Sequence, residues 1–283
     1  MEVIKVRSLD EFLQITEQLA VAFEYEKTLS SLCRRNSDEL LIPGFCACCE
    51  KEVDFQLDFK YSNGFMPNYR ERLLCPSCKL NNRQRLIVAK TKQLGKKDSQ
   101  LFMYECITPI YKQISALFDN VIGSEYISNA VVSGTIVNGT MHQDAENLSF
   151  HDSQFDLLIS NDVFEHVFDL KKAFSEAFRT LRPKGTLLFT IPFYHSELVS
   201  DKRAVLNDME VTFLKTPQYH GNPMSSQGSL VVHDFGWDII DSLLDAGFSD
   251  AYANVVYDVH NGNIGITPWN GILGAPMYFI ADK

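Results

Sequence analysis

The alternation of apolar and polar runs is clearest between residues 155 and 193. An apolar run over 157–159 ends in polar residues, a helical pattern continues to Arg179, and Pro183-Lys-Gly185 leads into a second apolar run. Two buried strands joined by a helix are typical of a parallel sheet covered by helices. The pattern therefore predicts a βαβ unit that binds a ligand at the carboxyl ends of its strands.

Other segments extend this α/β prediction. Residues 120–125 have the pattern of a second strand, and residues 235–248 have helical apolar spacing. The first 42 residues show amphipathic spacing, which predicts helices packed on the main domain or on a second subunit. From Val255 onward we expect the last strands, with a turn at 261–263.

Length and composition are consistent with one sizeable core. The chain has 283 residues, of which 45% are hydrophobic, enough for one α/β domain and a small appendage. No apolar run approaches the ~20 residues that span a bilayer, and the N-terminus lacks the basic and apolar regions of a signal peptide. We therefore expect a cytoplasmic protein with no membrane partner.

Two Cys-x-x-Cys pairs indicate a metal site. The pairs Cys46/Cys49 and Cys75/Cys78 are separated by 25 residues, and a hairpin between them would bring four sulfurs into the tetrahedral arrangement that zinc accepts. Cys48 is an alternative ligand in the first pair, and buried or incidental thiols are the alternative interpretation. Four protein ligands leave no open position, so the predicted Zn²⁺ is structural.

The net charge of −10 is unevenly distributed. Residues 69–97 hold nine Lys or Arg against the single acid Glu71, which leaves −18 on the rest of the chain. This basic segment and the zinc module could grip RNA, but the acidic remainder and the scarcity of aromatics near the segment argue against a nucleic-acid partner.

Three motifs in the predicted βαβ region resemble those of class I S-adenosylmethionine-dependent methyltransferases. They are an acidic strand end at 143–146, the strand Asp-Leu-Leu-Ile at 156–159, and Glu165-His-Val at the next helix. The resemblance implies an α/β, Rossmann-like, doubly wound and mostly parallel sheet, here with a small N-terminal zinc-binding domain. It also implies S-adenosyl-L-methionine as cofactor.

Further motifs resemble bacterial methyltransferases of sugar and polysaccharide pathways. The stretch 68–86 joins a Tyr-Arg-Glu, the second Cys pair and an Asn-x-Arg-x-Arg, and the chain later contains Tyr219-His-Gly-Asn and Phe235-Gly-Trp-Asp. The implied organisation is a helical segment at 1–42, a zinc module at 43–85 and a methyltransferase domain at 86–283. The domain has a substrate-side insertion at 191–235.

The resemblance assigns the cofactor residues. The usual Gly-x-Gly loop is missing after the first strand, at 101–111, which leaves a cofactor-free relic of the fold as an alternative. Thr108 is expected to cap the following helix with Pro109 in its first turn, so that free N–H groups face the cofactor's carboxylate. Glu125 would accept the ribose hydroxyls, and Asp144 with Ala145 would contact the adenine. The complete predicted set is Glu105, Thr108, Glu125, Asp144, Ala145, Asn161, Asp162, Phe164 and His166.

Methyl transfer to a hydroxyl or a protonated amine requires a base for the acceptor's proton. Histidine titrates in the appropriate range, and His195 and His220 are our catalytic candidates, ahead of His233. A hydrogen bond that orders a loop is the alternative role for each.

These observations predict a methyltransferase that acts on an O or N of a small molecule, a sugar nucleotide, saccharide or secondary metabolite. Two alternatives stay open at this point. One is an RNA base methyltransferase, and the other is a non-catalytic protein whose zinc domain binds a partner. The sequence also leaves a homodimer open.

Overall fold

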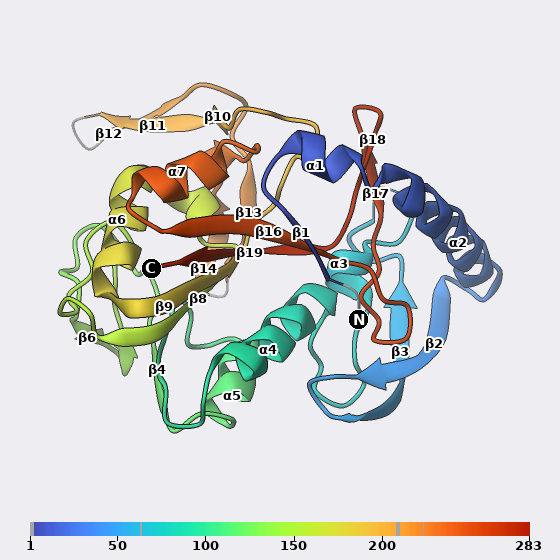
Figure 1. Cartoon of the computed structure of the whole chain (residues 1–283), viewed down its shortest axis with the longest axis horizontal. Coiled ribbons are helices and arrows are strands. Elements are labelled where there is room, and N and C mark those ends of the chain that lie inside the picture. The colour runs from blue at the N-terminus through green and yellow to red at the C-terminus, as the bar shows by residue number, and fades with distance from the viewer. Residues whose placement is uncertain (1–2, 63, 208–209, 223) are drawn as a thin grey trace. The chain divides into compact units, whose positions relative to one another are not determined.

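A computed structural model describes residues 3–62, 64–207, 210–222 and 224–283 (Figure 1). Residues 1 and 2 of the predicted N-terminal segment, 63 of the predicted zinc module, and 208, 209 and 223 of the predicted insertion lie outside the described residues. The chain forms two compact units. Unit 1 comprises Met1–Leu94 and Ala253–Tyr278, and unit 2 comprises Gly95–Tyr252 and Phe279–Lys283.

The largest sheet has seven strands in the order β1-β16-β19-β9-β8-β4-β5. The bounds are β1 Val3–Val6, β16 Asp250–Val256, β19 Met277–Asp282, β9 Leu181–Thr190, β8 Phe155–Asn161, β4 Gln100–Met103 and β5 Asn120–Gly123. Strands β5, β4, β8 and β9 are mutually parallel, whereas β19 is antiparallel to β9. The predicted Rossmann-like α/β class is confirmed.

The register of the parallel strands aligns their carboxyl ends. Met103 is opposite both Gly123 and Ile159, and Asn161 is opposite Thr190. The helices of unit 2 are α5 (Pro109–Ser115), α6 (Leu170–Thr180) and α7 (Ile239–Asp245). A cluster of fully buried aromatic rings forms the core of this unit, and it includes Phe102, Phe155, Phe164, Phe174 and Phe189.

The segment after β8 differs from the predicted helix. Phe164–His166 forms a single 3₁₀ turn, η1, and α6 begins only at Leu170, where the Asp169 side chain accepts the Lys172 amide. The Glu165 carbonyl accepts a hydrogen bond from the Val232 amide, 2.7 Å away, which fixes the turn against a distant segment. The Asp169 cap therefore sets the start of α6, and the long-range bond holds η1 as a separate turn before it.

Two other predicted elements also have different bounds. Helix α7 covers only part of 235–248 and begins at Ile239, because the Trp237 and Asp238 amides donate to the carbonyls of Glu197 and Leu198, both at 3.0 Å. The predicted turn at 183–185 is a bulge inside β9: Leu181 pairs with Phe155 and Thr186 pairs with Leu157. In strands the extra residues of a bulge lie outside the ladder.

The insertion at 191–235 consists mainly of short antiparallel pairs. They are β10 (Asp201–Lys202) with β15 (His233–Asp234), β11 (Ala204–Asn207) with β12 (Glu210–Phe213), and β13 (Tyr219–Asn222) with β14 (Ser225–Leu230). A further small pair in unit 2 is β6 (Ile136–Val137) with β7 (Thr140–Met141).

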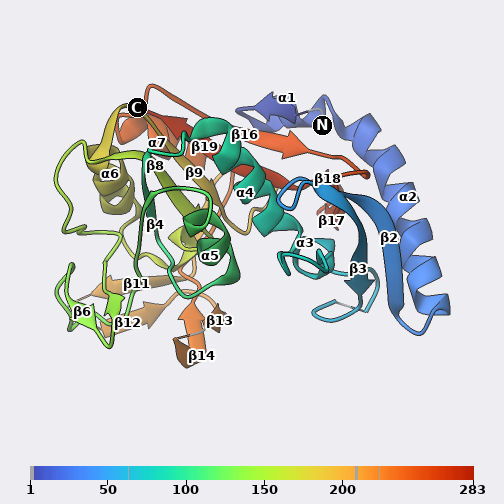
Figure 2. The same ribbon diagram turned by 90° about the horizontal axis from the view of Figure 1, so that it is seen from below.

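In unit 1 the long helix α2 (Thr16–Arg35) lies along the hairpin of β2 (Glu39–Cys46) and β3 (Lys51–Asp58), as Figure 2 shows. The remaining elements are α1 (Leu9–Leu13), α3 (Tyr69–Arg72), α4 (Asn82–Leu94), β17 (Thr267–Trp269) and β18 (Ile272–Gly274). The amphipathic helices predicted for the first 42 residues are present, with Phe12 and Leu19 buried.

Residues 253–278 are bound into unit 1 by buried polar groups. The two carboxylate oxygens of Glu26 on α2 accept the amides of Gly265 and Ile266, at 2.7 and 2.8 Å. Arg85 on α4 donates to the Gly262 carbonyl at 2.7 Å. No helix among the residues that the structure describes is both long and apolar enough to cross a membrane.

Candidate functional site

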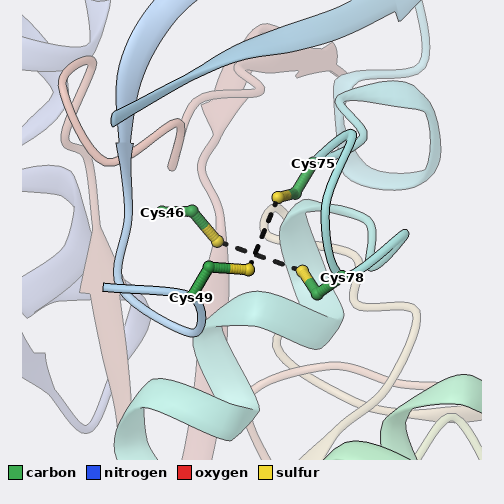
Figure 3. Close-up of side chains that lie close together, drawn as sticks. All are labelled: Cys46, Cys49, Cys75 and Cys78. Carbon is green, nitrogen blue, oxygen red and sulfur yellow. Dashed lines mark hydrogen bonds between the residues drawn. The ribbon is translucent and has the colours of Figure 1, made fainter. Parts of the chain in front are cut away.

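The four predicted cysteines converge in unit 1 (Figure 3). The Cys49 and Cys75 sulfurs are 3.8 Å apart, the Cys46 and Cys78 sulfurs are 4.0 Å apart, and all four lie within 4.8 Å of one another. Tetrahedral coordination with Zn–S bonds of about 2.3 Å requires sulfur–sulfur separations of about 3.8 Å. The four thiols are therefore spaced to hold a single ion of this kind.

Each cysteine pair lies in a tight backbone turn, and the two turns have the same hydrogen-bond pattern. In the first, the Glu50 amide donates to the Cys46 carbonyl at 2.7 Å, and in the second, the Lys79 amide donates to the Cys75 carbonyl at 3.0 Å. Glu50 and Lys79 both have positive φ, at 54° and 63°, which closes each turn after the second cysteine. The sequence alone indicated the spacing, and the structure adds this local geometry.

The two turns meet by a route that differs from the predicted one. The hairpin does not link the pairs; instead, its tip carries the first pair, between β2 and β3. The second pair is held beside β3 because Gln56 and Leu74 exchange two backbone hydrogen bonds of 2.8 Å. Cys48 lies outside the group of four, and its sulfur donates to the Arg85 carbonyl at 3.4 Å.

Several arginines of the basic segment bind protein acceptors within unit 1. Arg72 pairs with Asp58, and Arg83 pairs with Glu71 at 3.1 Å. Arg85 is buried, donates to the carbonyls of Leu73 and Leu80, and stacks over a phenylalanine ring. The two carbonyls bound by Arg85 flank Cys75 and Cys78, so this guanidinium group stabilises the second cysteine turn.

In unit 2, two predicted cofactor residues meet at the carboxyl ends of β4 and β8. Asn161 donates to the Glu105 carboxylate at 2.6 Å, and both side chains are largely buried. The Asn161 Oδ1 atom is buried without a hydrogen-bond partner among the described residues. A buried carboxylate beside an unpaired acceptor fits a cationic group, such as the ammonium of a bound amino acid.

Glu125 follows β5 and reaches the loop after β4. Its Oε1 atom accepts the amides of Cys106 and Ile107, at 2.8 and 3.1 Å. Thr108 accepts the Tyr111 amide and caps α5, with Pro109 in the first turn, so the predicted cap is confirmed. The loop that lacks Gly-x-Gly is thus ordered by a carboxylate from the neighbouring strand.

Gly123 makes this loop geometry possible. A Cβ at this position would lie 2.4 Å from the Tyr111 ring, 2.8 Å from the Cys106 Cβ and 2.8 Å from the Glu105 carbonyl oxygen. We expect Gly123→Ala to displace the loop and to lower the free energy of unfolding by about 1–3 kcal/mol. Thermal denaturation measures this effect. Gly221→Ala is the matched control because its Cβ would have no neighbour within 4 Å, and equal melting shifts for the two variants would contradict the prediction.

Asp144 and Ala145 lie close to Glu125 through the backbone. The Gln143 amide donates to the Glu125 carbonyl at 3.1 Å, and Asp144 Oδ1 accepts the Glu146 amide at 2.9 Å. Burial raises the pKa of Tyr126, and the carboxylates of Asp144 and Glu146 raise it further. Glu125 and Asp144 thus occupy adjoining segments of the chain.

The other predicted residues after β8 have different environments. Asp162 adopts a left-handed conformation, with φ of 52°, and its carboxylate accepts the Thr190 hydroxyl at 2.9 Å. Phe164 is fully buried and contacts the rings of Tyr104 and Phe174. A contact between Phe164 and a cofactor would therefore require the ring to leave the core.

The structure brings His220 and His166 together, but it brings His195 to neither by a described contact. The centroids of the His166 and His220 rings are 5.4 Å apart, and both rings lie close to the buried Glu165 carboxylate. His195 instead packs its ring on Phe193, and its carbonyl accepts the Trp237 indole N–H at 2.9 Å. Sequence reasoning used Glu165 only as part of the Glu165-His-Val motif and gave it no role in the site.

Comparison with known proteins gives a family for part of unit 2. Residues 110–189 match the family model described as "Methyltransferase domain". Over 84 residues the chain is 29% identical to a glycine/sarcosine/dimethylglycine N-methyltransferase of Actinopolyspora halophila; the match spans 29% of this chain and 15% of that relative's length. The sequence similarity to methyltransferases is thus confined to less than a third of the chain.

The comparison with solved structures gives matches to two S-adenosylmethionine-dependent methyltransferases. The one from Clostridium acetobutylicum is 15% identical with a TM-score of 0.42, covering 71% of this chain and 90% of that one. The one from Methanosarcina mazei is 16% identical with a TM-score of 0.39, covering 69% and 96%.

Proposed function

We propose that this chain is an S-adenosylmethionine-dependent methyltransferase that methylates an O or N of a small molecule. The observation that carries the proposal is the set of polar groups at the carboxyl ends of parallel strands, in a unit that contains the methyltransferase-domain match. Ligands of open α/β sheets bind at this edge. Glu105, Asn161 and Glu125 lie there, each at the end of a strand or just beyond it.

The donor set fits the cofactor. Glu105 and the unpaired Asn161 Oδ1 would hold the ammonium of its methionine portion, Glu125 would accept the ribose hydroxyls, and Asp144 would contact the adenine. When bound, S-adenosylmethionine supplies an electrophilic methyl group on a sulfonium. The chain's own residues would orient the acceptor and accept its proton, for which His195 and His220 are our candidates.

The acceptor is proposed to be a sugar nucleotide, a saccharide or a related secondary metabolite. The support is the resemblance of Tyr219-His-Gly-Asn and Phe235-Gly-Trp-Asp to bacterial methyltransferases of sugar pathways. These motifs lie in or beside the insertion, on β13 and at the approach to α7.

The cysteine group of unit 1 is proposed to bind one structural Zn²⁺. All four thiols would serve as ligands, so no position would remain for substrate or water. The RNA alternative is weakened because Arg72, Arg83 and Arg85 pair with protein acceptors. A phosphate backbone would have to compete with those contacts.

Isothermal titration with S-adenosylmethionine tests the proposed function. We expect the wild-type chain to bind the cofactor and Glu125→Ala to bind it about 10–100-fold more weakly, since one charge-assisted contact is worth about 1.5–3 kcal/mol. Glu210→Ala is the matched control, because Glu210 is an exposed glutamate of the same unit, on β12. Absence of binding by the wild type at millimolar cofactor would refute the proposal.

A further inference from the structure

We propose that Glu165, His166 and His220 form a second metal site, in unit 2, which binds a divalent cation of the zinc type and leaves a coordination position open. These residues come from η1 and from β13, 54 positions further along the chain. The site is separate from the four cysteines, which belong to unit 1.

The distances are those of ligands around one ion. Glu165 Oε1 lies 3.4 Å from His220 Nδ1 and 3.6 Å from His166 Nε2, and the three ligand atoms lie within 4.8 Å of one another. Both carboxylate–imidazole separations exceed the ordinary length of a hydrogen bond. Tetrahedral ligands at about 2.1 Å from Zn²⁺ are about 3.4 Å apart, which matches the observed separations.

The Glu165 carboxylate provides the second, independent observation. The residue is 0% exposed, and neither carboxylate oxygen has a hydrogen-bond partner among the described residues. An ionised carboxylate removed from water is costly unless it is paired or coordinates a metal. A cation between Glu165 and the two imidazoles would compensate both oxygens.

The backbone around the cluster sets the orientation of each histidine. His166 Nδ1 lies 2.7 Å from the Leu230 carbonyl oxygen, so Nδ1 donates to that carbonyl, and Nε2 is the ring nitrogen 3.6 Å from Glu165. Metal-binding histidines commonly donate their second N–H to a carbonyl in this way. The Val232 amide donates to the Glu165 carbonyl, which anchors η1 to the segment after β14.

His220 is presented by the hairpin of β13 and β14. Gly228 on β14 has φ of 81°, and a Cβ there would lie 2.3 Å from the His220 carbonyl oxygen. The pairing also shifts between His220 and Asn222. Only glycine allows this close approach, so the hairpin is shaped to hold the histidine in place.

Two imidazoles and one carboxylate are a ligand set used by catalytic zinc sites, which keep a further position for water or substrate. The open position would take the oxygen or nitrogen of the acceptor, and the cation would lower the pKa of that group. This role rests on the proposed methyl transfer, whereas metal binding itself does not. His220 would then be a ligand and not the base.

Metal analysis of zinc-saturated, desalted protein tests the site. We expect about two zinc ions per wild-type chain and about one in His220→Ala. Titration with Co²⁺ separates the sites: one equivalent gives a thiolate charge-transfer band, and the next adds only the weaker bands of nitrogen and oxygen ligands. A wild-type chain whose only bound metal has thiolate character would overturn the proposal.

Two further variants keep the result interpretable. His151→Ala removes an exposed histidine of unit 2 and should retain both ions. Glu165→Gln preserves the shape of the buried side chain and should lose the second ion with the far-ultraviolet circular dichroism unchanged. Retention of that ion by both Glu165→Gln and His220→Ala would also overturn the proposal. Cofactor titration of the same samples reports separately on the proposed function.

Discussion

Replacing Cys75 with serine is expected to release the metal proposed for unit 1 and to destabilise that unit strongly. Structural zinc contributes on the order of 10 kcal/mol of binding free energy, comparable with the whole stability of a domain. Cys75 is fully buried, so its loss also leaves a hydroxyl among three thiols. Chemical denaturation with and without a chelator measures the effect, and the wild type with chelator should resemble the variant.

Cys48→Ser is the matched control for this experiment. Cys48 is buried in the same turn, but its sulfur faces the Arg85 carbonyl and lies outside the group of four. A serine there can still donate to that carbonyl, so the metal content should be unchanged. Equal loss of metal from the two variants would contradict the ligand assignment, and a chelator-insensitive wild type would contradict the structural role.

Unit 1 is expected to lose stability as the pH rises from about 5 to 8, through the ionisation of Glu26. Burial raises the pKa of this carboxyl from 4.5 to about 8, although the amides of Ile266 and Gly265 and the Tyr257 side chain act in the opposite direction. The folded unit therefore binds the proton more tightly than the unfolded chain. The contribution of Glu26 to the free energy of unfolding is fully present below the pKa of the unfolded chain and is lost as the pH rises through the pKa of the folded unit. At pH 7 the loss relative to low pH is about 3 kcal/mol.

The difference in the free energy of unfolding between the wild type and Glu26→Gln isolates the contribution of Glu26. The other ionisable groups, including the cysteine thiols, are present in both proteins. The amide cannot ionise, so denaturation curves should show the variant gaining stability relative to the wild type as the pH rises. Glu24→Gln is the control, because Glu24 lies on the same helix and its side chain is 68% exposed. A difference that does not change between pH 5 and 8 would show that Glu26 keeps an ordinary pKa.

The sequence by itself determined the elements that depend on neighbouring residues. The continuous apolar run at 157–159 predicted a buried parallel strand, since a strand covered on both faces has no polar alternation. Thr108 and Pro109 predicted the start of α5, because the cap and the first turn are adjacent in sequence. The two-residue gap within each cysteine pair predicted the two tight turns for the same reason, whereas the contact between the turns depends on the pairing of Gln56 with Leu74.

Tertiary structure decided the contacts between residues that are distant in sequence. It placed residues 253–278 in unit 1, where Glu26 binds two of their amides, and it set the Cys48 sulfur against the Arg85 carbonyl. It also buried Glu165 between two histidines, one of them 55 positions away. Hydrophobic and polar periodicity specifies which face of an element is buried, whereas the partner across that face depends on how all the elements pack together.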